Sequence, residues 1–324
     1  MKKSKISFLC ITILLITASM LITNLTSNAE VAASKPSGTA SANPVIGIGR
    51  GTDFAKVTKD AISNAGGLKS IIKKGDTVII KPNLINAARY SKGVCTDYRV
   101  IQKIADEVKA CGAAKIIVAE ASPAGNIFKN VKYNDIKGVQ LLDMNTCGKS
   151  DCYRIKPKNS LTGHTFYIPK VYMDAKVVIS AAKLKTHSDA AASLSLKNSF
   201  GIPPTSFYKG GTWWKQDLHN LGVDDSIVDL NKIRKPDFSV IDGIVGLEGD
   251  GPVNGKPVKS NIVFAGKDPV AIDTVALNFM GFKADEVPHV PLAAKEGLGV
   301  SDLSKIKIVG AELNKIKMDF ERAR

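Results

Sequence analysis

The chain has 324 residues, of which 45 are Lys or Arg and 30 are Asp or Glu, so its formal net charge is +15 at pH 7. The basic residues are spread along the sequence without a nucleic-acid-binding motif, which argues against nucleic acid as a partner. Such a charge favours attraction to an anionic surface, such as a cell wall or a membrane.

The first 29 residues have the pattern of a secretory signal peptide. Lys2, Lys3 and Lys5 precede the apolar run ISFLCITILLITASMLI, and the small residues of SNA follow it. We predict that residues 1–29 are removed by cleavage after Ala29. The alternative is an uncleaved membrane anchor, because the run is nearly long enough to span a bilayer, and only then is a membrane a partner. In both cases the working part is expected to be extracytoplasmic, either secreted or associated with the cell envelope.

The remaining sequence is predicted to form one domain behind a linker. Residues 30–44 are rich in Ala, Ser and Pro, which is typical of a flexible linker. Residues 45–324 are expected to form a single α/β domain, with an irregular insertion near 183–219. An exported protein can form disulfides, and the sequence leaves open whether Cys147 and Cys152 pair. No CxxC run is present, so an iron–sulfur cluster is not expected in this chain.

Apolar runs of strand length alternate with segments of helical periodicity. The clearest helical pattern covers 96–112, where Thr96 can act as the N-cap and Gly112 can end the helix. Strands are predicted at 43–49, 76–84, 114–122, 138–144, 165–175, 175–183, 237–244, 260–266 and 304–310, and helices at 53–72, 96–112, 224–234 and 268–280.

Several of these strands are apolar without alternation, which is typical of parallel strands buried on both faces. We therefore predict a three-layer α/β fold, with a mostly parallel sheet and helices on both of its faces. In such sheets, ligands bind outside the carboxyl ends of the strands.

Two predicted strands end in basic residues. VIIKPN and VVISAAKLKTH place Lys81, Asn83, Lys183, Lys185 and His187 at strand ends that would lie on one edge of a parallel sheet. Because close positive charges repel strongly where water is scarce, such a group needs an anion or nearby carboxylates. We predict a crevice that binds a carboxylate or phosphate. The alternative is a set of solvated lysines with no common target.

Carboxylates follow a third strand and lie in one helix. Asp242 and Glu248 lie in FSVIDGIVGLEGDGPVNGKPV and could belong to the site or to a turn; this Gly-rich segment fits no nucleotide-binding fingerprint. Asp273 lies in a helix that is apolar nearly all round, so we expect it to be buried with a partner such as a lysine. The alternative is a half-exposed carboxylate in the first helical turn. Asp250 is assigned to a turn and Asp268 to a helix cap.

Two histidines flank the irregular stretch. His187 and His219 could meet over the crevice and move protons, since histidine titrates near neutrality. Together with Asp242 or Glu248 they could also bind a divalent metal, although no HExxH spacing supports this.

The motifs occur in an order that resembles domain-of-unknown-function family 362, from about Gly75 to Phe282. They are DTVIIKPNL, TDYRVIQKIADEVKACGAAKIIVAEAS, ISAAKLKTH, SLKNSFGIPP, VIDGIVGLEGDGP and GKDPVAIDTVALNFMGF. The family has no established activity. Some members carry a ferredoxin-like iron–sulfur module, whose cysteine runs are absent here. The sheet-edge layout is also loosely similar to the lactate racemase family, as a likeness of fold only. The motif positions correspond to Lys81, Asn83, Lys183, Lys185, His187, Lys197, Asn198, His219, Asp242, Glu248 and Asp273.

These observations give one functional hypothesis and two alternatives. The hypothesis is an exported protein that binds, and as an enzyme would transform, an anionic small molecule or a cell-envelope component. The first alternative is an extracytoplasmic binding protein without chemistry, and the second is a redox-associated protein like the iron–sulfur members. The sequence does not decide whether the protein is an enzyme. The anion would be held by Lys81, Asn83, Lys183, Lys185, Lys197 and Asn198, and acted on by His187, His219, Asp242, Glu248 and Asp273.

Overall fold

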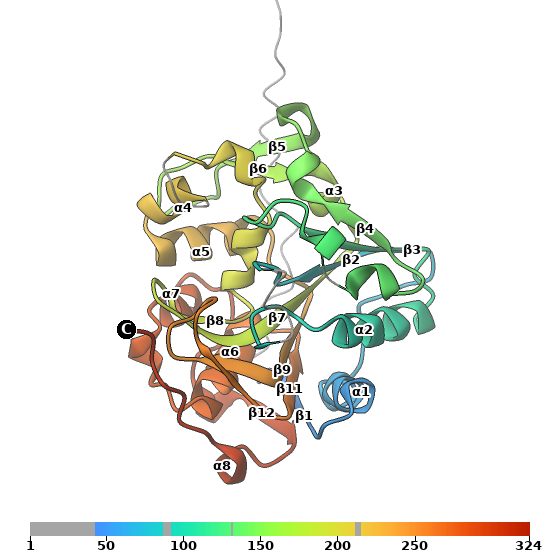
Figure 1. Ribbon diagram of the computed structural model, residues 1–324, viewed down its shortest axis with the longest axis vertical. Coiled ribbons are helices and arrows are strands. Elements are labelled where there is room, and N and C mark those ends of the chain that lie inside the picture. The colour runs from blue at the N-terminus through green and yellow to red at the C-terminus, as the bar shows by residue number, and fades with distance from the viewer. Residues whose placement is uncertain (1–42, 87–91, 131, 211–214) are drawn as a thin grey trace, which may run out of the picture.

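Figure 1 shows the computed structural model, which describes residues 43–86, 92–130, 132–210 and 215–324. The predicted signal peptide and residues 30–42 of the predicted linker lie outside the described residues. Within those described ranges, no helix is long and apolar enough to cross a membrane.

The molecule is organised around a ten-stranded sheet. Its strands are β1 (Val45–Arg50), β2 (Thr77–Pro82), β3 (Lys115–Glu120), β4 (Gln140–Asp143), β7 (Val177–His187), β8 (Ala191–Ser193), β9 (Phe238–Glu248), β10 (Lys256–Val258), β11 (Ile262–Gly266) and β12 (Lys307–Gly310). The main order is β12-β1-β11-β9-β7-β2-β3-β4, while β8 pairs with β7 and β10 with β9. Both neighbours of β11 are antiparallel to it, and the other five pairs along this order are parallel.

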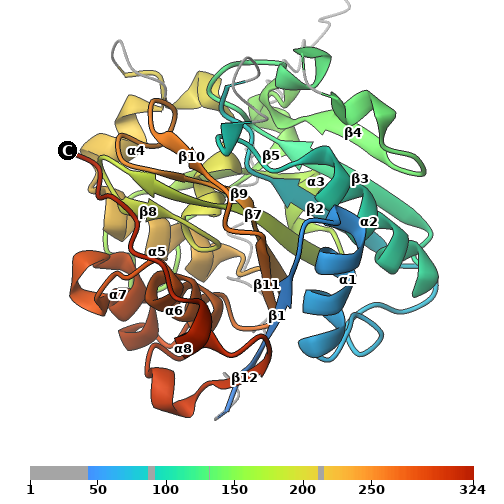
Figure 2. The ribbon, with the colours of Figure 1, turned by 60° about the horizontal axis from the view of Figure 1, so that its bottom comes forward.

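Helices cover both faces of this sheet, as Figure 2 shows. Helices α1 (Phe54–Asn64) and α2 (Tyr98–Ala110) share one hydrophobic core with the sheet. The opposite core contains α5 (Val223–Ile233), α6 (Pro269–Phe279) and α7 (His289–Lys295). The predicted three-layer, mostly parallel α/β fold is confirmed. The remaining elements are α3 (Lys170–Met173), α4 (Gln216–Asn220), α8 (Leu313–Ile316) and a separate two-stranded sheet of β5 (Cys152–Ile155) and β6 (Phe166–Pro169).

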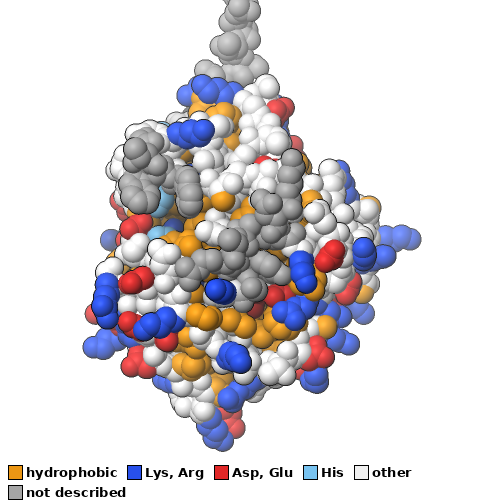
Figure 3. Space-filling view, viewed as in Figure 1, with side chains coloured by type: hydrophobic (Ala, Val, Ile, Leu, Met, Phe, Trp, Pro, Cys, Tyr) orange, Lys and Arg blue, Asp and Glu red, His pale blue; other side chains and the backbone are white. Residues whose placement is uncertain are grey.

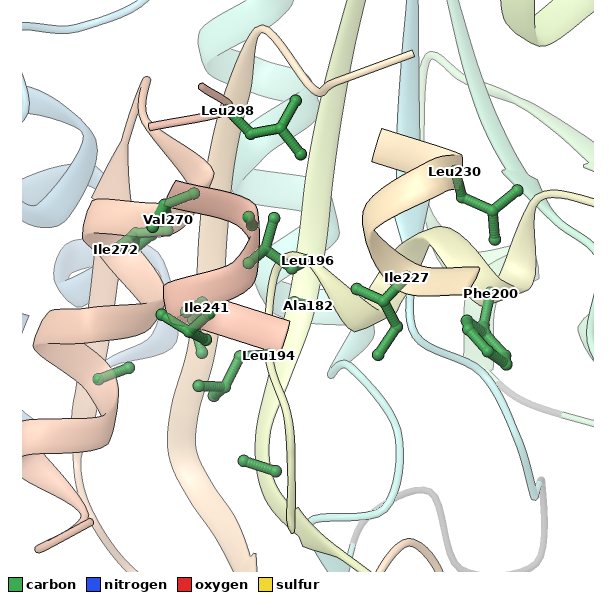
Figure 4. Close-up of a cluster of buried hydrophobic side chains, with 14 of the residues drawn as sticks. Ala182, Leu194, Leu196, Phe200, Ile227, Leu230, Ile241, Val270, Ile272 and Leu298 are labelled. Carbon is green, nitrogen blue, oxygen red and sulfur yellow. The ribbon is translucent and has the colours of Figure 1, made fainter. Parts of the chain in front are cut away.

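The core beside the site is formed by α5, α6 and the segment between β8 and α4, as Figure 4 shows. Ile227 of α5 and Ile272 of α6 are both fully buried, on either side of Leu196. Since α6 is covered on nearly all sides, its all-round apolar sequence follows from its central position. This packing fixes the backbone of the segment that carries Lys197.

The start of α2 corrects one prediction. Asp97, not Thr96, is the N-cap, and its carboxylate accepts a hydrogen bond from the Arg99 backbone N–H. The Thr96 hydroxyl instead accepts from the Asn83 N–H at 3.0 Å and donates to the Ala181 carbonyl at 2.7 Å. Both residue types can cap a helix. Here the threonine joins the residue that follows β2 to the middle of β7.

The stretch expected to be irregular contains regular structure. It continues β7 to His187, turns through β8, and forms the short 3-10 helix η6 (Lys197–Gly201) before α4. Glycine is required at Gly201, because a Cβ there would collide with the Glu120 carboxylate and the Lys81 amine. The cysteines at 147 and 152, whose pairing the sequence left open, are free thiols in this structure.

Candidate functional site

A cavity of about 890 Å³ lies at the carboxyl ends of β2, β3 and β7. This volume is within the range of small-molecule sites in proteins. Its wall includes six of the residues predicted for the site, namely Lys81, Asn83, Lys185, His187, Lys197 and His219. It also includes residues that the sequence did not single out, namely Glu120, Asp189, Lys215 and Arg324, together with Asp250, which was assigned to a turn.

Lys81 and Glu120 form a buried ion pair at the ends of β2 and β3. Their side chains are each 2% exposed and lie 2.9 Å apart. The Lys81 amine also donates to the Pro82 carbonyl at 2.8 Å and to Asn198 Oδ1 at 3.1 Å. Its three N–H groups are therefore used within the protein. Glu120 was not predicted as a site residue, although it ends a strand and the rule that identified Lys81 applies to it as well.

A second ion pair lies behind the cavity wall. Lys183 and Asp242 are 2.7 Å apart and at most 2% exposed, and neither lines the cavity. Asp242 also accepts the backbone N–H groups of Asp97 and Ile244. The register between β7 and β9 shifts after Lys183, because Lys183 and Lys185 pair with positions 242 and 247 of β9, and the extra residues of this irregularity lie in β9. Two lysines that are close in sequence on β7 therefore face different parts of β9 and have different surroundings.

Three further lysines are buried at the cavity without such a partner. Lys185, Lys197 and Lys215 are 1%, 8% and 3% exposed, and within the described ranges no carboxylate lies within 4.0 Å of their amines. Lys185 donates to the Val94 carbonyl at 2.7 Å and Lys215 to the Phe200 carbonyl at 2.6 Å. Burial lowers the pKa of Lys185 and of Lys215 to about 7 and that of Lys197 to about 8. We call these three residues the unpaired lysines.

His187 presents a proton to its surroundings rather than a lone pair. Its Nδ1 accepts the Asp189 backbone N–H at 3.0 Å, so the neutral ring carries its proton on Nε2. Burial, followed by the charges of Lys197 and Lys185, holds the pKa of His187 well below its usual range. The ring is therefore a neutral hydrogen-bond donor at Nε2. The predicted role of His187 in moving a proton stays a prediction, in which Nε2 would give a proton rather than accept one.

His219 has the opposite arrangement. Its Nδ1 lies 3.0 Å from the Lys215 carbonyl, which can only accept, so the proton is on Nδ1. Nε2 is then a free acceptor, 3.7 Å from the Asp189 carboxylate. Burial is the main cause that lowers the pKa of His219, and its side chain remains 25% exposed. Of the two cavity histidines, this one has the geometry of a base.

Asp273 and Asn198 lie outside the cavity wall and hold the backbone that carries a site residue. Asp273 is fully buried as predicted, but its partners are the backbone N–H groups of Ser195 and Leu196, at 2.8 and 2.9 Å, rather than a lysine. Burial raises the pKa of Asp273 to about 8. Asn198 donates to the Lys81 carbonyl and accepts from its amine. The two side chains fix the segment from which Lys197 projects.

Glu248 lies outside the cavity, contrary to its predicted place in the site. Its carboxylate accepts the Glu321 backbone N–H at 3.1 Å, while the Gly249 N–H donates to the Glu321 carbonyl. Glu248 therefore holds the C-terminal segment against the β9–β10 hairpin. The histidine and carboxylate set that the sequence suggested for a metal is not brought together, and the described residues contain no group of three or more His, Cys, Asp or Glu that could hold one.

The space-filling view adds the surroundings of the site. In Figure 3, histidine surface is visible beside hydrophobic surface at the level of α4, while Lys and Arg are scattered over this face. The cavity wall itself is mixed, because Leu84, Ile85, Val223 and Val253 line it together with the charged groups. The wall therefore offers both charged groups and apolar surface to a ligand.

Comparison with known proteins agrees with the motifs. Residues 78–278 match the family described as Domain of unknown function (DUF362). The chain belongs to this family. It is 29% identical over 242 residues to the "Thylakoid-associated protein sll1697" of Synechocystis sp. (strain ATCC 27184 / PCC 6803 / Kazusa), which covers 73% of this chain and 72% of that protein. The resemblance inferred from the sequence is confirmed.

A solved structure was also matched, the lactate racemase apoprotein from Thermoanaerobacterium thermosaccharolyticum. The two chains are 15% identical with a TM-score of 0.46, and the match covers 72% of this chain. This chain spans about half the length of that protein, since 56% of the racemase chain is covered.

Proposed function

We propose that this DUF362 protein binds a small organic anion, with a carboxylate or phosphate group held by the unpaired lysines. The observation that carries the proposal is the burial of Lys185, Lys197 and Lys215 around one cavity without carboxylate partners. Buried charges are ordinarily paired, and an anion supplies the missing partner. The cavity is far larger than a simple phosphate ion needs, and its apolar wall supports an organic body on the ligand.

The proposed location is extracytoplasmic. Support comes from the basic start, apolar centre and small-x-small end of residues 1–29. The name of the thylakoid-associated relative agrees with a place at or near a membrane. A small molecule is favoured over a cell-envelope polymer as the ligand, because the lysines line a cavity rather than an extended groove.

Calorimetric titration with matched pairs of probes tests the binding proposal. Pyridoxine 5′-phosphate and pyridoxine share an aromatic body and differ only in the phosphate, as phenyllactate and phenylethanol differ in the carboxylate. We expect saturable 1:1 binding of the anionic members only. The Lys109→Met variant is the control, since it removes one exposed positive charge from α2, on the other face of the sheet, and should bind as the wild type does. Equal binding of charged and uncharged members would refute the proposal.

A second candidate function, acid–base catalysis on the bound anion, is favoured by the two histidines. His219 Nε2 is placed to accept a proton and His187 Nε2–H to donate a hydrogen bond. Incubation of a bound oxo acid in D2O would reveal deuterium at the carbon beside the carbonyl. Loss of this exchange in His219→Gln is expected, and exchange at the wild-type rate in that variant would exclude His219 as the base.

A further inference from the structure

The three unpaired lysines differ in how their amines are held. Backbone carbonyls fix two of them, that of Val94 for Lys185 and that of Phe200 for Lys215. The Lys197 amine has no hydrogen-bond acceptor among the residues described, and it lies 4.4 Å from the centre of the Phe200 ring. Its nitrogen is therefore the one left available to a ligand.

The backbone that carries Lys197 is, by contrast, rigidly held. Asp273 accepts the two N–H groups that precede it, and Asn231 donates to the Leu196 carbonyl at 2.9 Å. Asn198, the next residue, is fixed by Lys81 and Ser180. A clamped backbone with such an amine is a costly arrangement for a purely structural lysine, since a buried amine without a hydrogen-bond acceptor does not recover the hydrogen bonds that it made to water.

We infer that Lys197 forms a Schiff base with a carbonyl group of the anion that the cavity binds. This inference rests on the proposed function, with Lys185 and Lys215 holding the carboxylate or phosphate of the same molecule. It names the ligand class as an oxo acid or an aldehyde that bears an anionic group. Amines that are buried in apolar surroundings and close to other cations are the lysines that proteins use as nucleophiles.

The step balances without a further reactant. The neutral amine forms a bond to the carbonyl carbon, and the π electron pair of the C=O bond moves to oxygen. His219 Nε2 accepts one amine proton and passes it to that oxygen, which gives a carbinolamine. The nitrogen lone pair then forms the C=N bond while the C–O bond breaks. The second amine proton passes to the departing hydroxyl, which leaves as water. His187 Nε2–H donates a hydrogen bond to the oxygen of this hydroxyl. The sum is R–NH2 plus O=CR2 giving R–N=CR2 plus H2O.

The neutral form of the amine is accessible near physiological pH. Burial lowers the pKa of Lys197 to about 8, and the nearby carboxylates of Asp189 and Asp224 oppose this. At pH 8 its neutral fraction is about 100-fold larger than that of an ordinary lysine of pKa 10.4. Labelling of Lys197 should therefore be at least about tenfold faster than that of any surface lysine.

Pyridoxal 5′-phosphate is a suitable probe, because it combines an aldehyde, a phosphate and an aromatic ring. The purified protein is incubated with one equivalent at pH 8, reduced with borohydride, and mapped by peptide mass spectrometry. We expect the first adduct on Lys197, and its suppression by pyridoxine 5′-phosphate, which lacks the aldehyde. In Lys197→Arg, which keeps a cation but not the nucleophile, total labelling should fall by one equivalent.

The possible failures are distinguishable. If pyridoxine 5′-phosphate binds but the first adduct lies on Lys185, Lys215 or surface lysines, the Schiff-base assignment is wrong and the anion-binding function stands. If neither phosphate binds saturably, both the assignment and the proposed function are wrong. Because the labelling is performed on the wild-type chain, the result does not depend on the folding of a variant.

Discussion

Two groups of buried lysines lie at the same edge of the sheet and differ in their partners. Lys81 and Lys183 are each bonded to a buried carboxylate, at 2.9 and 2.7 Å. The unpaired lysines have backbone carbonyls or an aromatic ring instead. The paired group is complete without a ligand, and the unpaired group is not. A lysine at a strand end therefore indicates a binding site only when the structure shows that its charge is uncompensated.

Breaking a pair should have the largest effect. Glu120→Gln removes the partner of Lys81 and leaves an uncompensated buried amine, at a cost of about 3–5 kcal/mol of folding free energy. Chemical denaturation would measure this loss. Lys109→Met on the exposed face of α2 is the control, with an expected change within about 0.5 kcal/mol. A Glu120→Gln variant as stable as the wild type would show that the pair does not hold these strand ends.

Removing an unpaired lysine should instead affect binding. Lys185→Met and Lys215→Met delete buried charges that no carboxylate compensates, so we expect unchanged or slightly higher stability without ligand. Each should lose about tenfold or more in affinity for pyridoxine 5′-phosphate, or ~1.4 kcal/mol. Calorimetry and denaturation on the same samples separate the two quantities. A large stability loss with unaltered affinity would place these lysines with the paired group.

The pH dependence of binding sharpens the same contrast. In the free protein the pKa of the unpaired lysines is about 7 to 8, and a bound anion raises it because it favours the charged form. Binding therefore takes up protons above pH 7. Affinity should be highest below pH 7 and fall by about 10- to 100-fold between pH 7 and pH 9. Titrations in two buffers of different ionisation enthalpy measure the uptake, and a binding enthalpy independent of buffer would contradict it.

The smallest expected effect on anion binding comes from changing the support behind Lys197. Asp273→Asn replaces one acceptor of the Ser195 and Leu196 N–H groups with an amide donor, which should cost about 1–3 kcal/mol. Pyridoxal 5′-phosphate labelling of Lys197 should slow, while anion binding at Lys185 changes less. Labelling at the wild-type rate in a folded variant would show that Asp273 does not position this lysine.

The sequence predicted the layers of the fold well because the signals are local. Unbroken apolar strands and the periodicity of α2 and α6 indicate a covered parallel sheet, and the strand-end rule brought Lys81, Lys185 and His187 to one edge. Which lysine forms an ion pair with which carboxylate could not be predicted in the same way. Glu120 ends β3 and Asp242 lies within β9, but which lysine each meets depends on strand order and on the register shift between β7 and β9.

Other site features depend on contacts between distant segments. No local sequence pattern indicates Lys215. It is a loop lysine whose amine is held at the cavity by a hydrogen bond to the Phe200 carbonyl. Glu248 looked equivalent to Asp242, yet it bonds to the C-terminal segment, which a local pattern cannot reveal. The histidine tautomers are likewise set by the Asp189 N–H and the Lys215 carbonyl.

The most direct test is an NMR titration of the lysine side chains with and without an anion, using protein labelled at the lysine ε-carbons and assigned with single Lys→Arg variants. We expect Lys185, Lys197 and Lys215 to titrate between about pH 7 and pH 8 in the free protein, and their pKa values to rise when pyridoxine 5′-phosphate is added. Titration of all three near the ordinary lysine value of about 10.4, unchanged by the anion, would contradict the account.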